Sequence, residues 1–139
     1  MKVLLKIIKY WLPVVIWALI IFNFSSHVVP KVGESYWVDF AAKKLAHILE
    51  YGIFAVISYR ALINSGVNKP LAYYIAIIIP FIYGASDELH QSFTPTRTPT
   101  IRDIVFDTIG ASIAIYLLAK LLPKAPVKVK IWAKKLDII

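Results

Sequence analysis

The sequence predicts an all-α integral membrane protein: a bundle of four transmembrane helices with both termini in the cytoplasm. First, hydrophobic residues make up 59% of the 139 residues and charged residues only 17%, against about 25% charged in typical soluble domains. Second, the chain contains four apolar runs of roughly 20 residues, the length that crosses a bilayer's hydrocarbon core. Third, backbone groups in lipid must be paired within their own segment, so these runs are helices rather than strands.

The first apolar run extends from Tyr10 to Phe24 and follows three lysines in the first nine residues. A basic start before an apolar run is also the pattern of a cleaved signal peptide. However, no A-x-A-like cleavage site follows, and three more apolar runs lie downstream. We therefore expect a membrane span, with Pro13 in its first turn, where a missing N–H costs little.

The second span is expected to begin near Lys43 and to end at about Ile63. A polar connection over residues 27–43 precedes it, and Tyr36 and Trp37 in this connection are expected to anchor the chain at the membrane interface.

The third and fourth spans follow a turn that the composition of residues 64–70 predicts. The third span is expected from Leu71 to Ser86, with a kink at Pro80. The fourth is expected from Asp103 to Leu122. Residues 1–125 thus form the predicted membrane domain, and residues 126–139 a basic cytoplasmic tail that lies on the membrane surface. Its surface contacts are expected from Ile131, Trp132 and Leu136.

The basic residues predict the orientation of the bundle. Four spans put both termini and the 60–70 turn on one side, and eleven of the sixteen basic residues fall there. Positive charge marks the cytoplasmic side, so both termini are expected to lie inside. The expected location is the plasma membrane, as a multi-pass protein. The net charge of +8 therefore does not indicate nucleic-acid binding. Such binding needs a basic stripe with aromatic residues for base stacking. The absence of cysteine excludes disulfides and thiolate sites.

Ionisable residues are concentrated at the opposite side of the predicted bundle. On the second span, Lys44, His47 and Tyr51 share one narrow helix face, and Glu50 lies beside His47. At the end of the third span, Asp87, His90 and Gln91 share a face, and we expect Glu88 to point away from it as a bystander. On the fourth span, Asp103, Asp107 and the small residues Gly110 and Ala114 are in line, so that a neighbouring helix can approach closely.

Three polar faces thus point to one place near the outer interface. A carboxylate in lipid costs about 2.5–3.5 kcal/mol unless it is paired or faces a polar cavity. The available counter-charges are Lys44, Arg97 and Arg102. The residues expected to bind a ligand are Lys44, His47, Tyr51, Asp87, His90, Gln91, Arg97, Asp103 and Asp107.

Several of these residues also have a purely structural interpretation, although Asp103 and Asp107, which lie on the small-residue face of the fourth span, are harder to explain in this way. The polar residues at the end of the third span are also compatible with an ordinary helix end that is exposed to solvent. Lys43 and Lys44 are also compatible with side chains that reach up to the interface, and a single His47 with a packed, hydrogen-bonded histidine. Convergence from three helices favours a functional site, because ionisable residues within membrane spans are functional by default.

Several short motifs lie on these helices. They are FSS at residues 24–26, Lys44-x-x-His47 followed by Glu50-Tyr51, Asp87-Glu88-x-His90-Gln91-x-Phe93, Pro95-x-Arg97 with Asp103, and Asp107 with Gly110. In these motifs the chain resembles the VanZ-like family of small membrane proteins, over roughly residues 22–115. It departs from the family pattern at Thr96, where Gly is usual, at Asp107, where Asn is common, and at His27, where Gln often follows the serines. The namesake of the family is associated with resistance to the glycopeptide antibiotic teicoplanin, and the resemblance implies a broader envelope role.

Three classes of function fit these residues. The first is a protein that binds or handles a lipid-linked envelope molecule or a lipoglycopeptide antibiotic, with Lys44 and Arg97 on its phosphate or carboxylate. The second is a membrane-embedded enzyme that acts on a lipid-linked glycosyl or phosphoryl substrate by acid–base or metal chemistry. Its candidate catalytic residues are His47, Glu50, Asp87, His90, Asp103 and Asp107.

The third class is a transporter or flippase, which the nearly bare inner halves of the spans disfavour. No H-E-x-x-H or comparable signature is present, so the sequence assigns neither a metal site nor a cofactor. Ser92 or Thr94 as a nucleophile is also disfavoured, because no base has a suitable spacing. The expected partners are the bilayer and a lipid-linked precursor or glycopeptide, with no nucleic acid; an oligomer is compatible with the sequence.

Overall fold

A computed structural model of the chain describes residues 2–27, 33, 35–93 and 99–139. It consists of helices, and the described residues include no strand. Three long helices, α1 (Lys2–Ser25), α2 (Tyr36–Asn64) and α3 (Lys69–Gln91), precede α4 (Ile101–Tyr116). A π-helical turn, Leu117–Leu121, and a 3₁₀ turn, Leu122–Lys124, extend α4. All four segments are long and apolar enough to cross a membrane, which confirms the predicted four-span all-α fold.

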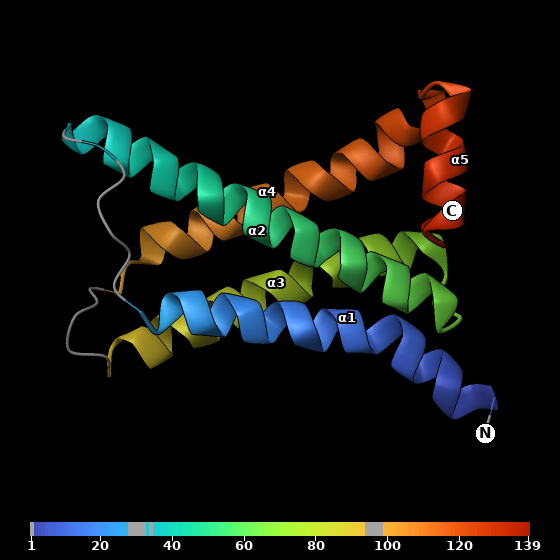
Figure 1. The fold of residues 1–139 in the computed structure, drawn as a ribbon, viewed down its shortest axis with the longest axis horizontal. Coiled ribbons are helices and arrows are strands. Elements are labelled where there is room, and N and C mark those ends of the chain that lie inside the picture. The colour runs from blue at the N-terminus through green and yellow to red at the C-terminus, as the bar shows by residue number, and fades with distance from the viewer. Residues whose placement is uncertain (1, 28–32, 34, 94–98) are drawn as a thin grey trace.

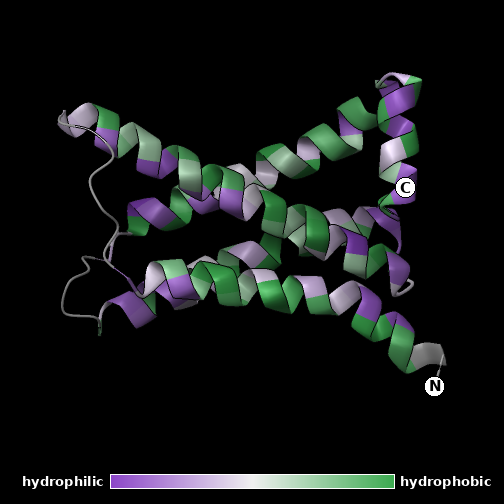
Figure 2. Cartoon of the chain, viewed as in Figure 1, coloured by the Kyte–Doolittle hydropathy of each residue, from purple (hydrophilic) through white to green (hydrophobic). Residues whose placement is uncertain are grey.

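The helices form a bundle with two distinct ends (Figure 1). Both termini and the turn between α2 and α3 lie at one end, which we call the termini end. The C-terminal ends of α1 and α3 and the N-terminal ends of α2 and α4 lie at the other, which we call the connection end. Hydrophobic residues cover the middle of the helices, and hydrophilic residues gather towards the two ends (Figure 2).

Helices α2 and α4 cross at a point where their backbones touch (Figure 1). A Cβ atom added to Gly110 would lie 2.3 Å from the carbonyl oxygen of Ile48 and 2.7 Å from its Cα. A Cβ on Gly52 would lie 3.3 Å from the carbonyl oxygen of Gly110. Small residues let helices approach closely in lipid, where packing rather than the hydrophobic effect drives association. The predicted small-residue face at Gly110 is therefore the contact face of α4.

Two apolar clusters fill the interior. One is formed by buried side chains of α2, α3 and α4, including Ala55, Tyr59, Ala76 and Ile115. The other joins α1 to α2. Many large apolar side chains, such as Leu19 and Ile82, are exposed on the outside of the bundle. In a bilayer these side chains face lipid, so they need no protein cover.

The structure corrects two expected helix boundaries. Helix α2 begins at Tyr36, so Tyr36 and Trp37 belong to its first turn and not to a polar connection. The aromatic rings of Tyr36 and Phe40 stack, with centroids 6.2 Å apart, and extend the helix beyond its apolar part. Helix α1 begins at Lys2, which places Pro13 in the helix interior instead of the first turn. In both cases the helix extends beyond the uncharged part of its span: residues 2–9 contain three lysines, and residues 36–43 contain Asp39 and Lys43.

Proline instead begins α3. Pro70 lies in the first turn of this helix, where its missing N–H has no intrahelical partner to lose. Asn68 is the N-cap residue, and its side-chain oxygen accepts a hydrogen bond from the Leu71 N–H at 3.0 Å. Residue 70 is therefore part of the helix and not of the predicted turn.

The C-terminal tail folds back on the bundle. It forms α5 (Val127–Lys135), whose Ala133 is buried. Beyond α5, Asp137 pairs with Lys9 of α1 at 2.8 Å, and its carbonyl oxygen accepts a hydrogen bond from Asn64 of α2 at 2.9 Å. The Lys9 ammonium lowers the pKa of the Asp137 carboxyl. These contacts hold the tail against the termini end; Ile131, Trp132 and Leu136 remain exposed, as a contact with the membrane would require.

Candidate functional site

Two side-chain pairs join α2 to α4 near the connection end. Lys44 donates a hydrogen bond to the carboxylate of Asp103, and both side chains are largely buried, with exposed fractions of 13% and 16%. One turn deeper, His47 Nδ1 lies 2.8 Å from Asp107 Oδ1. Asp107 is fully buried. The spacing of three residues on α2 and four on α4 stacks the two pairs along the interface, as helical periodicity requires.

Helix α3 closes the site around the second Asp107 oxygen. A Cβ atom added to Gly84 would lie 2.9 Å from Asp107 Oδ2 and 3.3 Å from Tyr51 Cε1, so any side chain at residue 84 would displace them. Tyr51 is fully buried, and its ring is parallel to that of His47, with centroids 6.4 Å apart. Gly84 was not among the residues expected from the sequence. Its spacing from Asp87 and Gln91, three and seven residues, places it on the same helix face.

A second hydrogen-bonded group joins α3 to α1. Gln91 Nε2 donates to Asp87 Oδ2 at 2.9 Å and to Ser25 Oγ at 2.9 Å. All three residues are buried. Asp87 Oδ1 is buried without a hydrogen-bond partner among the described residues. Ser25 was not among the expected site residues, although it is the middle residue of the FSS motif.

Glu88 does not point away as a bystander. Its exposed fraction is only 7%, and its Oε2 accepts a hydrogen bond from the backbone N–H of Thr100 at 2.7 Å. Thr100 is the N-cap residue of α4, so Glu88 ties the end of α3 to the start of α4. The expectation was wrong because helical periodicity shows which residues share a face of the helix. It does not show which faces another segment covers. The chain that enters α4 covers the neighbouring face as well.

The remaining expected site residues lie at the edge of this cluster or elsewhere. The ring of His90 lies 4.7 Å from that of Phe22, on α1. Glu50 is half-buried and within electrostatic range of His47, Asp107 and Asp87. Arg102 is exposed, and its guanidinium lies 5.3 Å from the centroid of the Phe40 ring instead of pairing deep in the site. Arg97 lies outside the described residues, as do Thr94 and Thr96.

Comparison with known protein families gives a match over most of the chain. The family model described as VanZ/LLP1 matches residues 6–122 of the chain. The chain belongs to the VanZ/LLP1 family. The matched region contains the pairs between α2 and α4 and the group that includes Ser25 and Gln91. No curated protein and no solved structure matches the chain.

The motifs that suggested this family are separate in sequence and meet in the structure. Ser25 of FSS contacts Gln91 of the Asp87–Phe93 motif. Lys44 and His47 contact the two aspartates of α4. Polar residues from several motifs of this VanZ/LLP1 member therefore lie in one cluster within the described part of the chain, which we call the polar site. Its described members are Ser25, Lys44, His47, Glu50, Tyr51, Gly84, Asp87, Glu88, Gln91, Asp103 and Asp107.

Carboxylates dominate the polar site. Five of its members are acids, and all lie within electrostatic range of at least two others. Its described basic groups are Lys44, which Asp103 already engages, and His47. Within the described part of the chain, no three His, Asp or Glu side chains lie close enough to hold a metal ion. Chemically, the site offers mainly hydrogen-bond acceptors.

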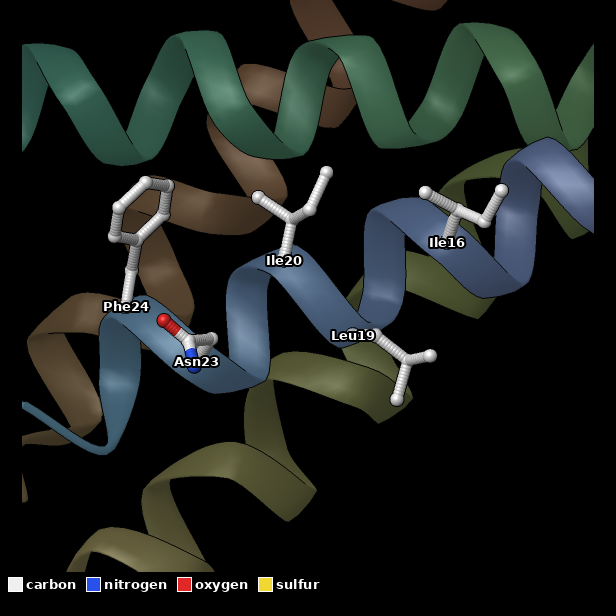
Figure 3. Close-up of a pocket in the computed structure, with 5 residues that line it drawn as sticks. All are labelled: Ile16, Leu19, Ile20, Asn23 and Phe24. Atoms are coloured by element: carbon white, nitrogen blue, oxygen red, sulfur yellow. The ribbon is translucent and has the colours of Figure 1, made fainter.

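An open groove of about 300 Å³ lies on α1 (Figure 3). It is lined by Ile16, Leu19, Ile20, Asn23 and Phe24. Ile16, Ile20 and Phe24 point from α1 towards α2 (Figure 3). The lining is apolar apart from Asn23, which suits a lipid chain better than a polar head group.

Proposed function

We propose that the connection end faces the cell exterior and that the polar site binds or handles a lipid-linked molecule of the cell envelope, or a lipoglycopeptide antibiotic. On this proposal the protein lies in the plasma membrane with both termini in the cytoplasm, in agreement with the excess of basic residues at the termini end. The observation that carries the proposal is the pair of buried polar contacts, Lys44–Asp103 and His47–Asp107, near the connection end.

A role in stability alone does not account for so many charged groups. Each ionisable residue in a span costs about 2.5–3.5 kcal/mol to insert on the lenient scale. Helices α2 and α4 already have an apolar means of association in their close approach at Gly110. Replacing a buried ion pair by apolar residues is often neutral or stabilising. The additional carboxylates of Asp87 and Glu88 therefore favour a role in binding.

The acceptors in the polar site indicate the kind of head group. Because Asp103 neutralises Lys44, the interior favours the hydroxyl and amine groups of a sugar or amino sugar over a bare phosphate. A phosphate or carboxylate would be bound at the rim by Arg102, since guanidinium groups bind such oxygens in bidentate fashion. Arg97 is proposed as a further contact on the strength of the sequence alone. We therefore favour a glycosylated lipid or a lipoglycopeptide as the ligand.

The experiment is a titration of the protein in lipid nanodiscs with a lipid-linked sugar and with the same lipid that carries only phosphate. The glycosylated lipid should bind more tightly, and Lys44→Ala and Arg97→Ala should each weaken its binding by tenfold or more, which corresponds to about 1.4 kcal/mol. Lys69→Ala, at the termini end, is the matched control and should change nothing. Binding that is unaltered in both site variants would contradict the proposal.

A second candidate function is acid–base catalysis on such a lipid. The contact that favours it is His47–Asp107, because a buried carboxylate that orients an imidazole is a common arrangement in general-base catalysis. Turnover of a lipid-linked glycosyl or phosphoryl substrate that is lost in His47→Ala and His90→Ala would support an enzyme. Metal analysis of the purified protein tests its metal-dependent form. Transport is disfavoured, because an apolar cluster lies between the polar site and the termini end.

A further inference from the structure

Helix α5 has an unusual position for a nine-residue helix. It runs across the termini end of the bundle, while the four spans run towards that end (Figure 1). Two contacts from α2 fix it there: Arg60 Nε donates to the Leu136 carbonyl oxygen at 2.6 Å, and Asn64 donates to that of Asp137. Because membrane spans end at the interface, a helix that crosses their ends lies near the plane of the membrane surface.

One edge of α5 carries apolar side chains that the protein leaves uncovered. Val129, Trp132 and Leu136 recur at the helical spacing of three and four residues, and we call them the α5 stripe. Their exposed fractions are 45%, 64% and 53%. The buried residue Ala133, which faces the bundle, follows Trp132 directly. The stripe therefore lies along a flank of α5, beside the bundle and not underneath it.

Lysines border the α5 stripe. From Lys124 to the C-terminus, with Lys124 included, the chain has five lysines and one acid, Asp137. That acid is already engaged by Lys9 and Arg60, at 2.8 and 3.5 Å. The ammonium of Lys135 lies 5.3 Å from the Trp132 ring centroid, so charge and apolar surface are adjacent. Lysine and tryptophan side by side are typical of the headgroup region of a bilayer.

We propose that α5 is an interfacial helix that binds anionic phospholipids of its own leaflet. The α5 stripe inserts at the boundary between head groups and acyl chains, and Lys128 and Lys135 bind lipid phosphates. The positive charge of α5 favours an anionic lipid leaflet over a second copy of the chain as the partner of the α5 stripe. A second copy of this chain would bring an equally basic end and would be repelled, whereas an anionic leaflet attracts each lysine near its surface. Asp137 holds α5 in place and leaves its lysines free for lipid.

The first test compares two variants that lose the same charge. Lys135→Gln removes one positive charge from α5, and Lys43→Gln removes one from the connection end. Native mass spectrometry measures how much phosphatidylglycerol each protein retains in competition with phosphatidylcholine. At about 1 kcal/mol per lysine, the α5 variant should lose selectivity about fivefold. The connection-end variant should keep it. Equal losses in the two variants, or no loss in either, would overturn the proposal.

The second test locates the α5 stripe directly. The chain has no cysteine, so a single one can be labelled with a polarity-sensitive fluorophore. In vesicles that contain phosphatidylglycerol, the label at Val129→Cys should report an apolar environment, and the label at Lys128→Cys an aqueous one. An aqueous signal at both positions would overturn the proposal. Disulfide-linked dimers through residue 129 in the bilayer would also overturn it, in favour of a second copy as the occupant.

Discussion

His47 Nδ1 of α2 lies 2.8 Å from Asp107 Oδ1 of α4, while Gly84 of α3 faces the other oxygen of the same carboxylate. Three membrane spans thus meet at one buried acid. Gly84 has no side chain, which leaves room for both Asp107 and Tyr51. The contact between His47 and Asp107 lies at the centre of the polar site. Single substitutions at these residues therefore test what the contact contributes.

Asp107 should be sensitive to loss of its oxygens and less sensitive to loss of its charge. Asp107→Ala leaves His47 Nδ1 without its acceptor in a buried place, so we expect the free energy of unfolding to fall by about 3 kcal/mol. Asp107→Asn keeps an oxygen for the ring and should cost about 1 kcal/mol or less. Unfolding in mild detergent, followed by helical circular dichroism, measures both. Equal losses would show that the hydrogen bond does not stabilise the fold.

The Lys44–Asp103 pair should show strong coupling between its two members. Lys44→Met leaves a largely buried carboxylate unpaired, and we expect it to lower the free energy of unfolding by about 3 kcal/mol. Adding Asp103→Leu removes that carboxylate and should restore most of the loss, because apolar replacements of buried pairs are often neutral. The double-mutant cycle is measured in the same unfolding assay. Additive effects of the two substitutions would mean that the side chains do not interact.

The crossing of α2 and α4 should tolerate a methyl group at one glycine and not at the other. In Gly110→Ala the new Cβ would lie 2.3 Å from the Ile48 carbonyl oxygen, so the helices must separate. We expect a loss of about 3 kcal/mol, at the upper end for overpacking. Gly52→Ala is the matched control: its Cβ would lie 3.3 Å from the Gly110 carbonyl oxygen, which a small shift relieves. A larger loss for Gly52→Ala would contradict the close approach at Gly110.

The polar site could be predicted from the sequence as far as helical periodicity reaches. Periodicity placed Lys44 and His47 on one face of α2 and Asp103 and Asp107 on one face of α4, and the structure brings these two faces together. It could not reveal Glu88, because the partner of Glu88 is a backbone N–H twelve residues along the chain. Contacts that depend on how a connection folds back leave no periodic pattern.

The fold itself was predictable because a bilayer permits few alternatives. Apolar length alone identified the four spans. It failed at the helix ends, where Tyr36 and Pro13 were misplaced, since a helix that extends into the interface is no longer apolar. The return of the tail was not predictable either, because it depends on a long-range pair, Lys9–Asp137. Hydropathy shows which segments are apolar enough to enter the bilayer. It does not show which segments contact each other.

The attachment of the tail should depend on pH. The Lys9 ammonium holds the pKa of Asp137 below its ordinary value. A lowered pKa in the folded state means that the carboxylate contributes stability above its unfolded pKa of about 3.9, and that this contribution is lost as the pH falls through the folded value. Spin labels at Lys69→Cys and Lys130→Cys should give a broader distance distribution well below pH ~4 than at neutral pH, because only the contacts of Arg60 and Asn64 with the tail then remain. Asp137→Asn should show the broader distribution at both pH values, and a distribution as narrow as that of wild type at neutral pH would contradict the role of the pair.

The most direct test of the central claim separates the polar site from the stability of the fold. Lys44→Met with Asp103→Leu is expected to fold but lacks one charged pair of the site. Lipid mass spectrometry on the purified proteins should find a glycosylated envelope lipid with wild type and with Lys69→Ala, and none with the folded double variant. A double variant that retains the same lipid as wild type, or a wild type that retains only bulk phospholipid, would contradict a ligand site between α2, α3 and α4.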